Sequence, residues 1–173
     1  MTKRATPLDR FARDIAPGTL KWIGIRTERR APMTQLSRVE ALAGLGLAGD
    51  HRVSGKPGSG RQVTLISQEF IAQIQHFTGH KQIDPGLLRR NLVVSGINLN
   101  ALRYQRFAIG EALFEAAALC HPCSRMETAL GKGGVAAMLG HGGLCCRVLR
   151  SGWIAVQDRV SVHTQDTQQE LFD

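Results

Sequence analysis

Short apolar segments recur along this chain at intervals that leave little room for helices between them. Such segments, rich in β-branched or alternating apolar residues, are typical of β-strands and occupy residues 20–25, 62–66, 90–95, 104–109, 112–119, 144–149 and 160–162. Parallel strands need connections of about a dozen residues or more, usually helical. Most connections here are shorter, so the sequence predicts a mostly β or α+β domain whose strands form a closed or partly closed barrel with a few flanking helices.

Helical patterns occur in only a few places. Ser67 stands at an N-cap position, and apolar residues then recur at helical spacing until Gly79. Two short helical patterns broken by glycines follow Cys123, and residues 8–15 form a further short candidate. The sequence therefore predicts a strand followed by a helix around Ser67.

The length of the chain indicates one domain. It has 173 residues, within the range of about 100 to 200 expected for a single domain. We expect one domain over 1–173, with a core over about 20–163 and polar ends over 1–18 and 164–173. The first residues lack an apolar run of signal-peptide length, and their acidic residues argue against a transit peptide. No apolar run approaches the roughly 20 residues of a membrane span, so we expect a cytoplasmic protein with no membrane partner.

A net charge of +8 suggests an anionic partner. Nucleic acid, an anionic membrane and a phosphorylated small molecule each repay concentrated positive charge. Aromatic residues make up only 5% of the chain, which leaves little of the stacking surface that single-stranded nucleic acid requires, and nucleic acid is not favoured. The basic residues cluster around 26–30, 52–61, 89–90 and 103–106. Either several arms reach one anionic ligand, or the surface is merely basic.

The four cysteines all lie between Cys120 and Cys146. Thiols stay reduced in the cytosol, so metal ligation, nucleophilic chemistry or core packing is favoured over disulfides. The pair at Cys120 and Cys123 suits a zinc knuckle, a thiol redox pair or a single thiolate ligand. Zinc would normally need a second pair at ligand spacing, although a Cys3His site that uses His141 stays open. The βαβ context of a thioredoxin-like pair is missing.

Cys123 is the favoured single thiolate ligand. It comes directly before Ser124, where a helix is predicted to begin, and a helix N-terminus favours the thiolate that a soft metal binds. Adjacent residues of a strand point to opposite faces, and we interpret Cys145 and Cys146 as small buried hydrophobic residues. The role of Cys120 stays open.

Five segments stand in a characteristic order: GLAGDHR, RQVTLIS, LRRNLVVSGINL, the C-x-P-C of Cys120 to Cys123, and GHGGLCCRVLRSGWIAVQDRV. In this order they resemble the MOSC domain family, named for the C-terminal domain of molybdenum cofactor sulfurase. The resemblance extends from about Lys21 to Val162 and is strongest to short, stand-alone, pyridoxal-independent bacterial members. One departure is that the family's Gly-Asp near the end is Gln157-Asp158 here, a change we expect to be harmless.

The resemblance implies a β-rich barrel that binds the molybdenum cofactor, also called molybdopterin. Cys123 matches the cysteine that holds molybdenum in the enzyme members. Arg89 and Asn91 match an Arg-x-Asn at the start of a strand that contacts the cofactor. Ser67 and His121 match positions of further cofactor contacts.

Other candidates rest on weaker patterns. Arg61 and Lys56, in the glycine-rich loop, are candidate cofactor contacts, with a solvated basic loop as the alternative. Arg89 and Arg90 cannot both face one side of a strand, so we assign Arg89 to the cofactor and Arg90 to the surface. His51 is a candidate proton donor near the metal, with a structural histidine as the alternative.

The resemblance implies an oxidoreductase that reduces small N-hydroxylated compounds such as hydroxylaminopurines. The sequence has no Rossmann glycine fingerprint and no four-cysteine iron–sulfur motif, so we expect electrons from a separate flavoprotein. One alternative is a binding module that carries the cofactor or a sulfur atom on Cys123 without turnover. A second is a nucleic-acid or structural protein in which the cysteines are incidental. No feature of the sequence indicates an oligomeric state.

Overall fold

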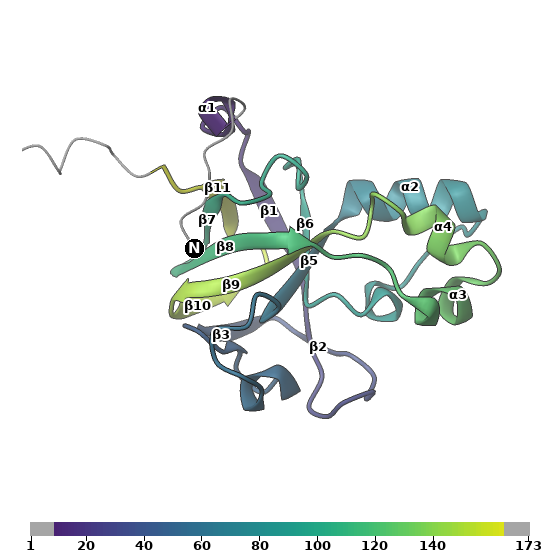
Figure 1. Ribbon diagram of the computed structural model, residues 1–173, viewed down its shortest axis with the longest axis horizontal. Helices are drawn as coiled ribbons and strands as arrows, with labels where there is room; N and C mark the ends of the chain where they lie inside the picture. The colour runs from purple at the N-terminus through teal and green to yellow at the C-terminus, as the bar shows by residue number, and fades with distance from the viewer. Residues whose placement is uncertain (1–8, 165–173) are drawn as a thin grey trace, which may run out of the picture.

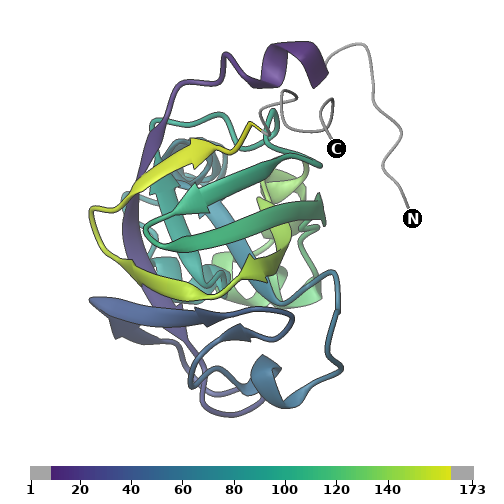
Figure 2. The same cartoon turned by 90° about the vertical axis from the view of Figure 1, so that its left-hand side faces the viewer.

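A closed β-barrel forms the body of the protein. The computed structural model describes residues 9–164, and within them seven strands follow one another in the order β11-β7-β8-β9-β5-β6-β1, with β11 pairing back onto β1. Figure 2 looks onto the strands that form the wall of this barrel. The strands are β1 (Gly18–Ile25), β5 (Val63–Ser67), β6 (Leu92–Ser95), β7 (Arg106–Ile109), β8 (Ala112–Leu119), β9 (Leu144–Arg150) and β11 (Arg159–Val162). The prediction of a mostly β barrel is confirmed.

Four further strands lie outside the ring. β2 (Thr34–Leu36) pairs with β1, while β10 (Gly152–Ala155), β3 (Arg38–Leu42) and β4 (Gly46–Leu47) form a second sheet. In β3 the side chains of Val39 and Ala41 are buried between more exposed neighbours, as expected for a strand with one covered face.

The helices gather at one side of the barrel, as Figure 1 shows for α2 (Gln68–Thr78), α3 (Ser124–Leu130) and α4 (Gly134–Met138). Two 3-10 turns, η1 (His51–Ser54) and η2 (Pro85–Leu88), lie within the connections to β5 and β6. The helix predicted over 8–15 is shorter, α1 (Asp9–Ala12), and Leu8 lies outside the described residues. No helix within 9–164 is long and apolar enough to cross a membrane.

Strand alternation divides the apolar residues into two cores. Inside the barrel, Leu65 packs among residues such as Phe107 and Phe114, whose rings stack with centroids 5.5 Å apart. The next residue of β5, Ile66, points outward and packs against the helices, in a second cluster that includes Met126. The outer core attaches the helices to the barrel wall.

Helix α2 begins and ends where the sequence predicts. The Oγ of Ser67 accepts a hydrogen bond of 3.1 Å from the backbone N–H of Phe70, which satisfies a donor that the first turn leaves free. Gly79 ends the helix with φ 75°, and its N–H donates to the Gln75 carbonyl at 2.9 Å. Both ends are therefore fixed by local chemistry.

The prediction that Arg90 lies on the surface is wrong. Arg89 has φ 57°, a left-handed conformation, and strand β6 begins only at Leu92, so the alternation of strand faces does not apply. Arg90 is only 4% exposed. Its guanidinium donates to the carbonyl oxygens of Leu88 and Gly142, each at 2.8 Å, and more distantly to that of Cys120. Arg90 joins η2, the residue after β8 and the segment before β9.

The departure at Gln157 leaves the local turn in place. Gln157 has φ 80°, a conformation that costs a non-glycine residue roughly 1–2 kcal/mol. Its N–H donates to the Leu20 carbonyl at 2.8 Å. The turn before β11 therefore forms with glutamine in place of the family's glycine.

Gly143 provides a test of the packing at the start of β9. A Cβ at this position would collide with the carbonyl oxygen of Leu65, and its φ of 88° is also left-handed. We expect Gly143→Ala to lower the free energy of unfolding by more than about 3 kcal/mol. Gly140→Ala is the matched control, because Gly140 has φ 79° with no atom within 4 Å of the added Cβ, and should cost only roughly 1–2 kcal/mol. Equal losses in urea unfolding would contradict the close approach.

Candidate functional site

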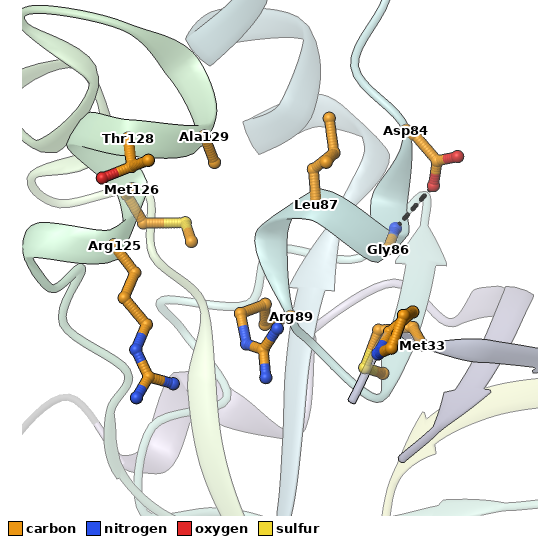
Figure 3. A pocket seen from close by; sticks show the side chains of 10 residues that line it. Met33, Asp84, Gly86, Leu87, Arg89, Arg125, Met126, Thr128 and Ala129 are labelled. Carbon is orange, nitrogen blue, oxygen red and sulfur yellow. Dashed lines mark hydrogen bonds between the residues drawn. The ribbon is translucent and has the colours of Figure 1, made fainter. Parts of the chain in front are cut away.

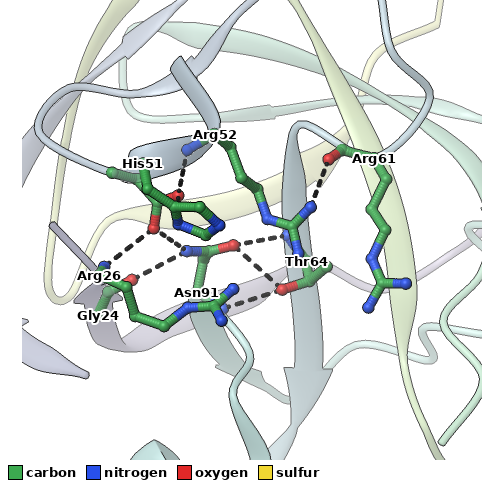
Figure 4. Close-up of polar contacts among 8 residues, drawn as sticks. Gly24, Arg26, His51, Arg52, Arg61, Thr64 and Asn91 are labelled. Carbon is green, nitrogen blue, oxygen red and sulfur yellow. Dashed lines mark hydrogen bonds and ion pairs between the residues drawn. The ribbon is translucent and has the colours of Figure 1, made fainter. Parts of the chain in front are cut away.

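A buried hydrogen-bond network joins three segments beside the barrel (Figure 4). The Oδ2 of Asp50 accepts hydrogen bonds from the backbone N–H of Arg26 at 3.0 Å and from the side-chain amide of Asn91 at 3.1 Å. Its Oδ1 accepts from the backbone N–H of Arg52 at 3.0 Å. Asp50 is only 3% exposed, so this carboxylate fixes the end of β1, the start of η1 and the approach to β6 relative to one another.

The side chain of Asn91 has no hydrogen-bonding capacity left for a ligand. Its amide nitrogen donates to the Gly24 carbonyl and to Asp50, and its oxygen accepts from both the N–H and the hydroxyl of Thr64, all at 3.1 Å. A carboxamide offers two donors and two acceptor lone pairs. The side chain of Asn91 therefore positions the neighbouring segments, and a contact of this residue with the cofactor stays a prediction.

Five arginines approach one another beside this network, and we call Arg26, Arg52, Arg61, Arg89 and Arg125 the arginine cluster. Burial, followed by the charges of Arg89 and Arg52 and to a lesser degree that of Arg125, lowers the pKa of Arg26 to about 10. Burial and the charge of Arg61 lower the pKa of Arg52. These pKa shifts show that like charges lie close together. Their repulsion costs free energy, and a bound anion would reduce it.

Three buried nitrogen atoms of the cluster have no hydrogen-bond partner among the described residues: Arg26 Nε, Arg52 Nε and Arg89 Nη2. Buried donors are normally paired, because leaving one unpaired costs roughly 1–3 kcal/mol. The nearby carboxylate of Asp50 binds the backbone N–H groups of Arg26 and Arg52. The unpaired donors and the surplus charge fit an anionic ligand such as a phosphate.

His51 lies at the edge of the network with its Nδ1 3.2 Å from Asp50 Oδ1. This contact lacks hydrogen-bond geometry, and Nδ1 has no partner within the described part of the chain. Burial lowers the pKa of His51, and Arg26 and Arg52 act in the same direction, while Asp50 opposes them. A lowered pKa keeps the imidazole neutral near pH 7, which does not favour a resting proton donor.

Cys120 and Cys145 form a thiol pair on the outer face of the barrel. In the antiparallel ladder Ala118 is opposite Cys145, and the N–H of Cys120 donates to the Gly143 carbonyl at 2.8 Å, so the two side chains are diagonal neighbours on one face. A hydrogen bond from Cys145 lowers the pKa of Cys120 to about 6, with Arg90, Arg61 and Arg52 contributing. The same hydrogen bond and burial raise the pKa of Cys145. The hydrogen bond between the two thiols therefore favours a single negative charge on the pair.

Cys145 and Cys146 are both buried, as predicted. Cys146 belongs to the barrel core, and burial raises its pKa. His141 packs edge-on against the rings of Phe70 and Phe77. Among residues 9–164, no group of three or more His, Cys, Asp or Glu side chains is placed to hold a metal ion.

Cys123 is exposed at the N-cap of α3, where its side chain makes no capping hydrogen bond. Its thiol lies close enough to Arg90 to influence the pKa of that arginine. His121, two residues earlier, is exposed. Arg61 is also exposed, yet its charge acts on Cys120, Arg52 and Arg90. The charge of Arg61 thus acts within the cluster, whereas Cys123 lies near Arg90, which is outside it.

Ser67 and Lys56 are not brought to the cluster in the same way. Thr64, which binds Asn91, lies three residues before Ser67 in β5, and strand rise separates them by roughly 10 Å. The Ser67 hydroxyl is buried and caps α2. Lys56 is exposed in the loop after η1, and its charge is not among those that shift the cluster's pKa values.

Sequence reasoning missed Arg26, Arg52 and Arg125 as individual site residues, and also the pairing of Cys120 with Cys145. Arg26 and Arg52 did fall within the basic segments that were interpreted either as arms reaching one anionic ligand or as a merely basic surface. Two of these arginines could have been found from their positions at the ends of predicted elements. Arg26 directly follows a predicted strand, and Arg125 directly follows the predicted helix start. The pairing of the two thiols depends on strand register, which no local pattern reveals.

The barrel and its arginine-rich site define a class of protein. The sequence profile of the MOSC domain matches residues 50–161, more than half of the chain, and this protein belongs to the MOSC domain family. The family takes its name from the C-terminal domain of molybdenum cofactor sulfurase. The matched residues include Asp50, Asn91 and all four cysteines.

Solved structures share the fold at low sequence identity. The YuaD protein from Bacillus subtilis has a TM-score of 0.73 at 22% identity, over 87% of this chain and 98% of that one. YiiM from Geobacillus stearothermophilus has a TM-score of 0.68 at 15% identity, over 87% and 77%. YiiM from Escherichia coli has a TM-score of 0.64 at 15% identity, over 85% and 70%. A search of curated proteins gives no match.

The thiol pair predicts a pH-dependent contribution to stability. Because the pKa of Cys120 falls from 9.0 to about 6 on folding, its contribution is complete above pH 9.0 and is lost as the pH falls through about 6. We expect Cys145→Ala to raise the pKa of Cys120, since the thiolate loses its S–H donor. The ultraviolet absorbance of the thiolate, taken as the difference from Cys120→Ser, measures this pKa. Cys146→Ala is the control and should leave it near 6. An unchanged value in Cys145→Ala would refute the pairing.

Proposed function

We propose that this protein is a molybdenum-cofactor oxidoreductase that reduces small N-hydroxylated compounds such as hydroxylaminopurines. The observation that carries the proposal is the set of buried, unpaired donors of Arg26, Arg52 and Arg89, together with an exposed thiol, Cys123, near Arg90. An anion with a soft metal at one end suits both features, because arginine binds phosphate and thiolate binds soft metals. Membership of the MOSC domain family supports the same cofactor.

The residues fit the cofactor in two parts. Arg26, Arg52 and Arg89 have free donors for its phosphate and other anionic groups. Cys123 is accessible and would supply the thiolate ligand to molybdenum. When bound, the cofactor supplies a centre that exchanges two electrons and accepts an oxygen atom from the substrate.

The overall reaction converts R–NH–OH, two electrons and two protons into R–NH2 and water. The protein's own side chains bind and orient the reactants around Cys123. His51, neutral near pH 7 because burial lowers its pKa, suits a hydrogen-bonding role more than that of a resting acid. We propose that the electrons come from a separate flavoprotein.

A non-catalytic carrier is the second candidate function. The exposure of Cys123 favours it, because an accessible thiol at a helix start could receive sulfur or a cofactor from another protein. The two candidates differ in turnover. Stoichiometric molybdenum with reduction of a hydroxylaminopurine supports the oxidoreductase, and bound cofactor without reduction supports the carrier.

Cys123→Ala tests the assignment of the metal ligand. Because the substitution removes the thiolate, we expect loss of bound molybdenum and of hydroxylaminopurine reduction in protein made in a host that synthesises the cofactor. Molybdenum per protein is measured by mass spectrometry, and amine product by chromatography. The matched control is Ser124→Ala, at the exposed neighbouring position, which should keep both. Full activity in Cys123→Ala would overturn the assignment.

Arg52→Gln tests the role of the arginine cluster. The variant removes one unpaired buried donor and one charge, so we expect cofactor retention to fall about tenfold or more, the value of a charge-assisted hydrogen bond. Retained molybdenum after dialysis at rising salt gives the measurement. Arg103→Gln is the control, since Arg103 is exposed and stacks on Tyr104. Equal retention in the two variants would place the cofactor elsewhere.

A further inference from the structure

A pocket of about 460 Å³ opens beside the arginine cluster, between η2 and α3 (Figure 3). Its volume lies within the range of roughly 300–1,000 Å³ typical of small-molecule sites. Its apolar walls and few polar groups are contributed by Pro32, Met33, Asp84, Gly86, Leu87, Arg89, Arg125, Met126, Thr128 and Ala129. The proposed metal ligand, Cys123, is the N-cap of α3, and Arg125 in the first turn of the same helix lines the pocket.

The walls of the pocket suit a flat ring. Met33 carries a thioether, which adapts to irregular shapes and makes favourable contacts with aromatic rings. Met126 also lines the pocket but is only 2% exposed and belongs to the outer core. Leu87 is 49% exposed, and its side chain lines the pocket. Covering it with a ring would remove apolar surface from water.

The charge of the pocket favours an anion. Figure 3 shows the guanidinium groups of Arg89 and Arg125 extending in the same direction from facing walls. The one carboxylate in the lining, Asp84, accepts the Gly86 N–H at 2.7 Å as the cap of η2. Arg125 forms no ion pair among the residues that the structure describes, and its charge lowers the pKa of Arg26. An anionic group would offset this repulsion.

We propose that this pocket is the substrate subsite and that it takes a planar heteroaromatic compound with an anionic substituent, such as a purine nucleotide, whose anionic group meets Arg125. The inference rests on the proposed function and extends it from a reaction type to a substrate class. The ring lies against Leu87 and Met33. Arg89, which has an unpaired nitrogen and lines the pocket, stands at the border with the cofactor residues Arg26 and Arg52.

Product binding to the full-length, molybdenum-loaded protein tests the proposal without turnover. Adenine and adenosine 5′-monophosphate are the reduced counterparts of 6-hydroxylaminopurine and its nucleotide, and calorimetry gives both affinities. We expect the monophosphate to bind about tenfold more tightly, as one charge-assisted hydrogen bond provides. Arg125→Gln should weaken only the monophosphate, and Lys132→Gln, at an exposed position after α3, should change neither. Equal affinities for the two ligands in the wild type would overturn the anionic contact.

Leu87→Trp tests the ring site by filling the pocket. Because Leu87 is half exposed, the variant should fold, bind both ligands at least tenfold more weakly and keep its molybdenum. Leu139→Trp, at a 60% exposed position outside the pocket lining, is the control. Unchanged affinities in Leu87→Trp, or loss of molybdenum, would overturn the substrate subsite. Adenine binding without reduction of any N-hydroxylated compound would sink the proposed function alone, and reduction without product binding would sink the subsite alone.

Discussion

The site depends on the way Asp50 binds its neighbours. This buried carboxylate accepts the backbone N–H groups of Arg26 and Arg52 and the side chain of Asn91. It therefore fixes where both arginines leave the backbone, while their Nε atoms stay unpaired within the described chain. A structure that holds buried charges without neutralising them gains stability when an anion binds, because a ligand of the folded state shifts the folding equilibrium. Anion binding and local order are thus coupled at this site.

The fold could be predicted where local patterns decide the structure. Strand β8 spans Ala112–Leu119, the range that alternation indicates, and Ser67 and Gly79 bound α2 through contacts with residues three or four positions away. Barrel closure is different, since it pairs Gly18 with Val160. That register depends on how every strand between them curves. The sequence therefore indicated a barrel and left its closure open.

The site was harder to predict than the fold because it depends on the direction of strands. β5 and β6 run parallel, so Ser67 at the end of one strand and Asn91 before the start of the other lie at opposite ends of the pair. The sequence pattern shows that Ser67 and Asn91 each lie at an end of a strand. It does not show whether those two ends lie together or at opposite ends of the pair. The left-handed backbone at Arg89 could not be predicted from the sequence either. It changes the direction of the chain before Arg90, which is buried although we expected it on the surface. The exposed thiol of Cys123 and the basic segments could be singled out from the sequence because they depend on residue type, while the role of Cys123 as metal ligand stays a prediction.

The distribution of charge indicates where an anion would lie in the cluster. The thiol pair of Cys120 and Cys145 raises the pKa of Arg52 and of the neighbouring Arg90, opposing the effect of burial. Arg52 therefore already has a negatively charged partner when the pair is ionised. Arg26 is influenced instead by Arg89, Arg52 and Arg125, with Asp50 as the opposing charge. The repulsion that an anion would relieve therefore lies between Arg26, Arg89 and Arg125, and the last two of these line the pocket. An anionic cofactor bound to Arg26 and an anionic substrate bound to Arg125 would lie on either side of Arg89. Each anion would reduce part of the repulsion among these three arginines.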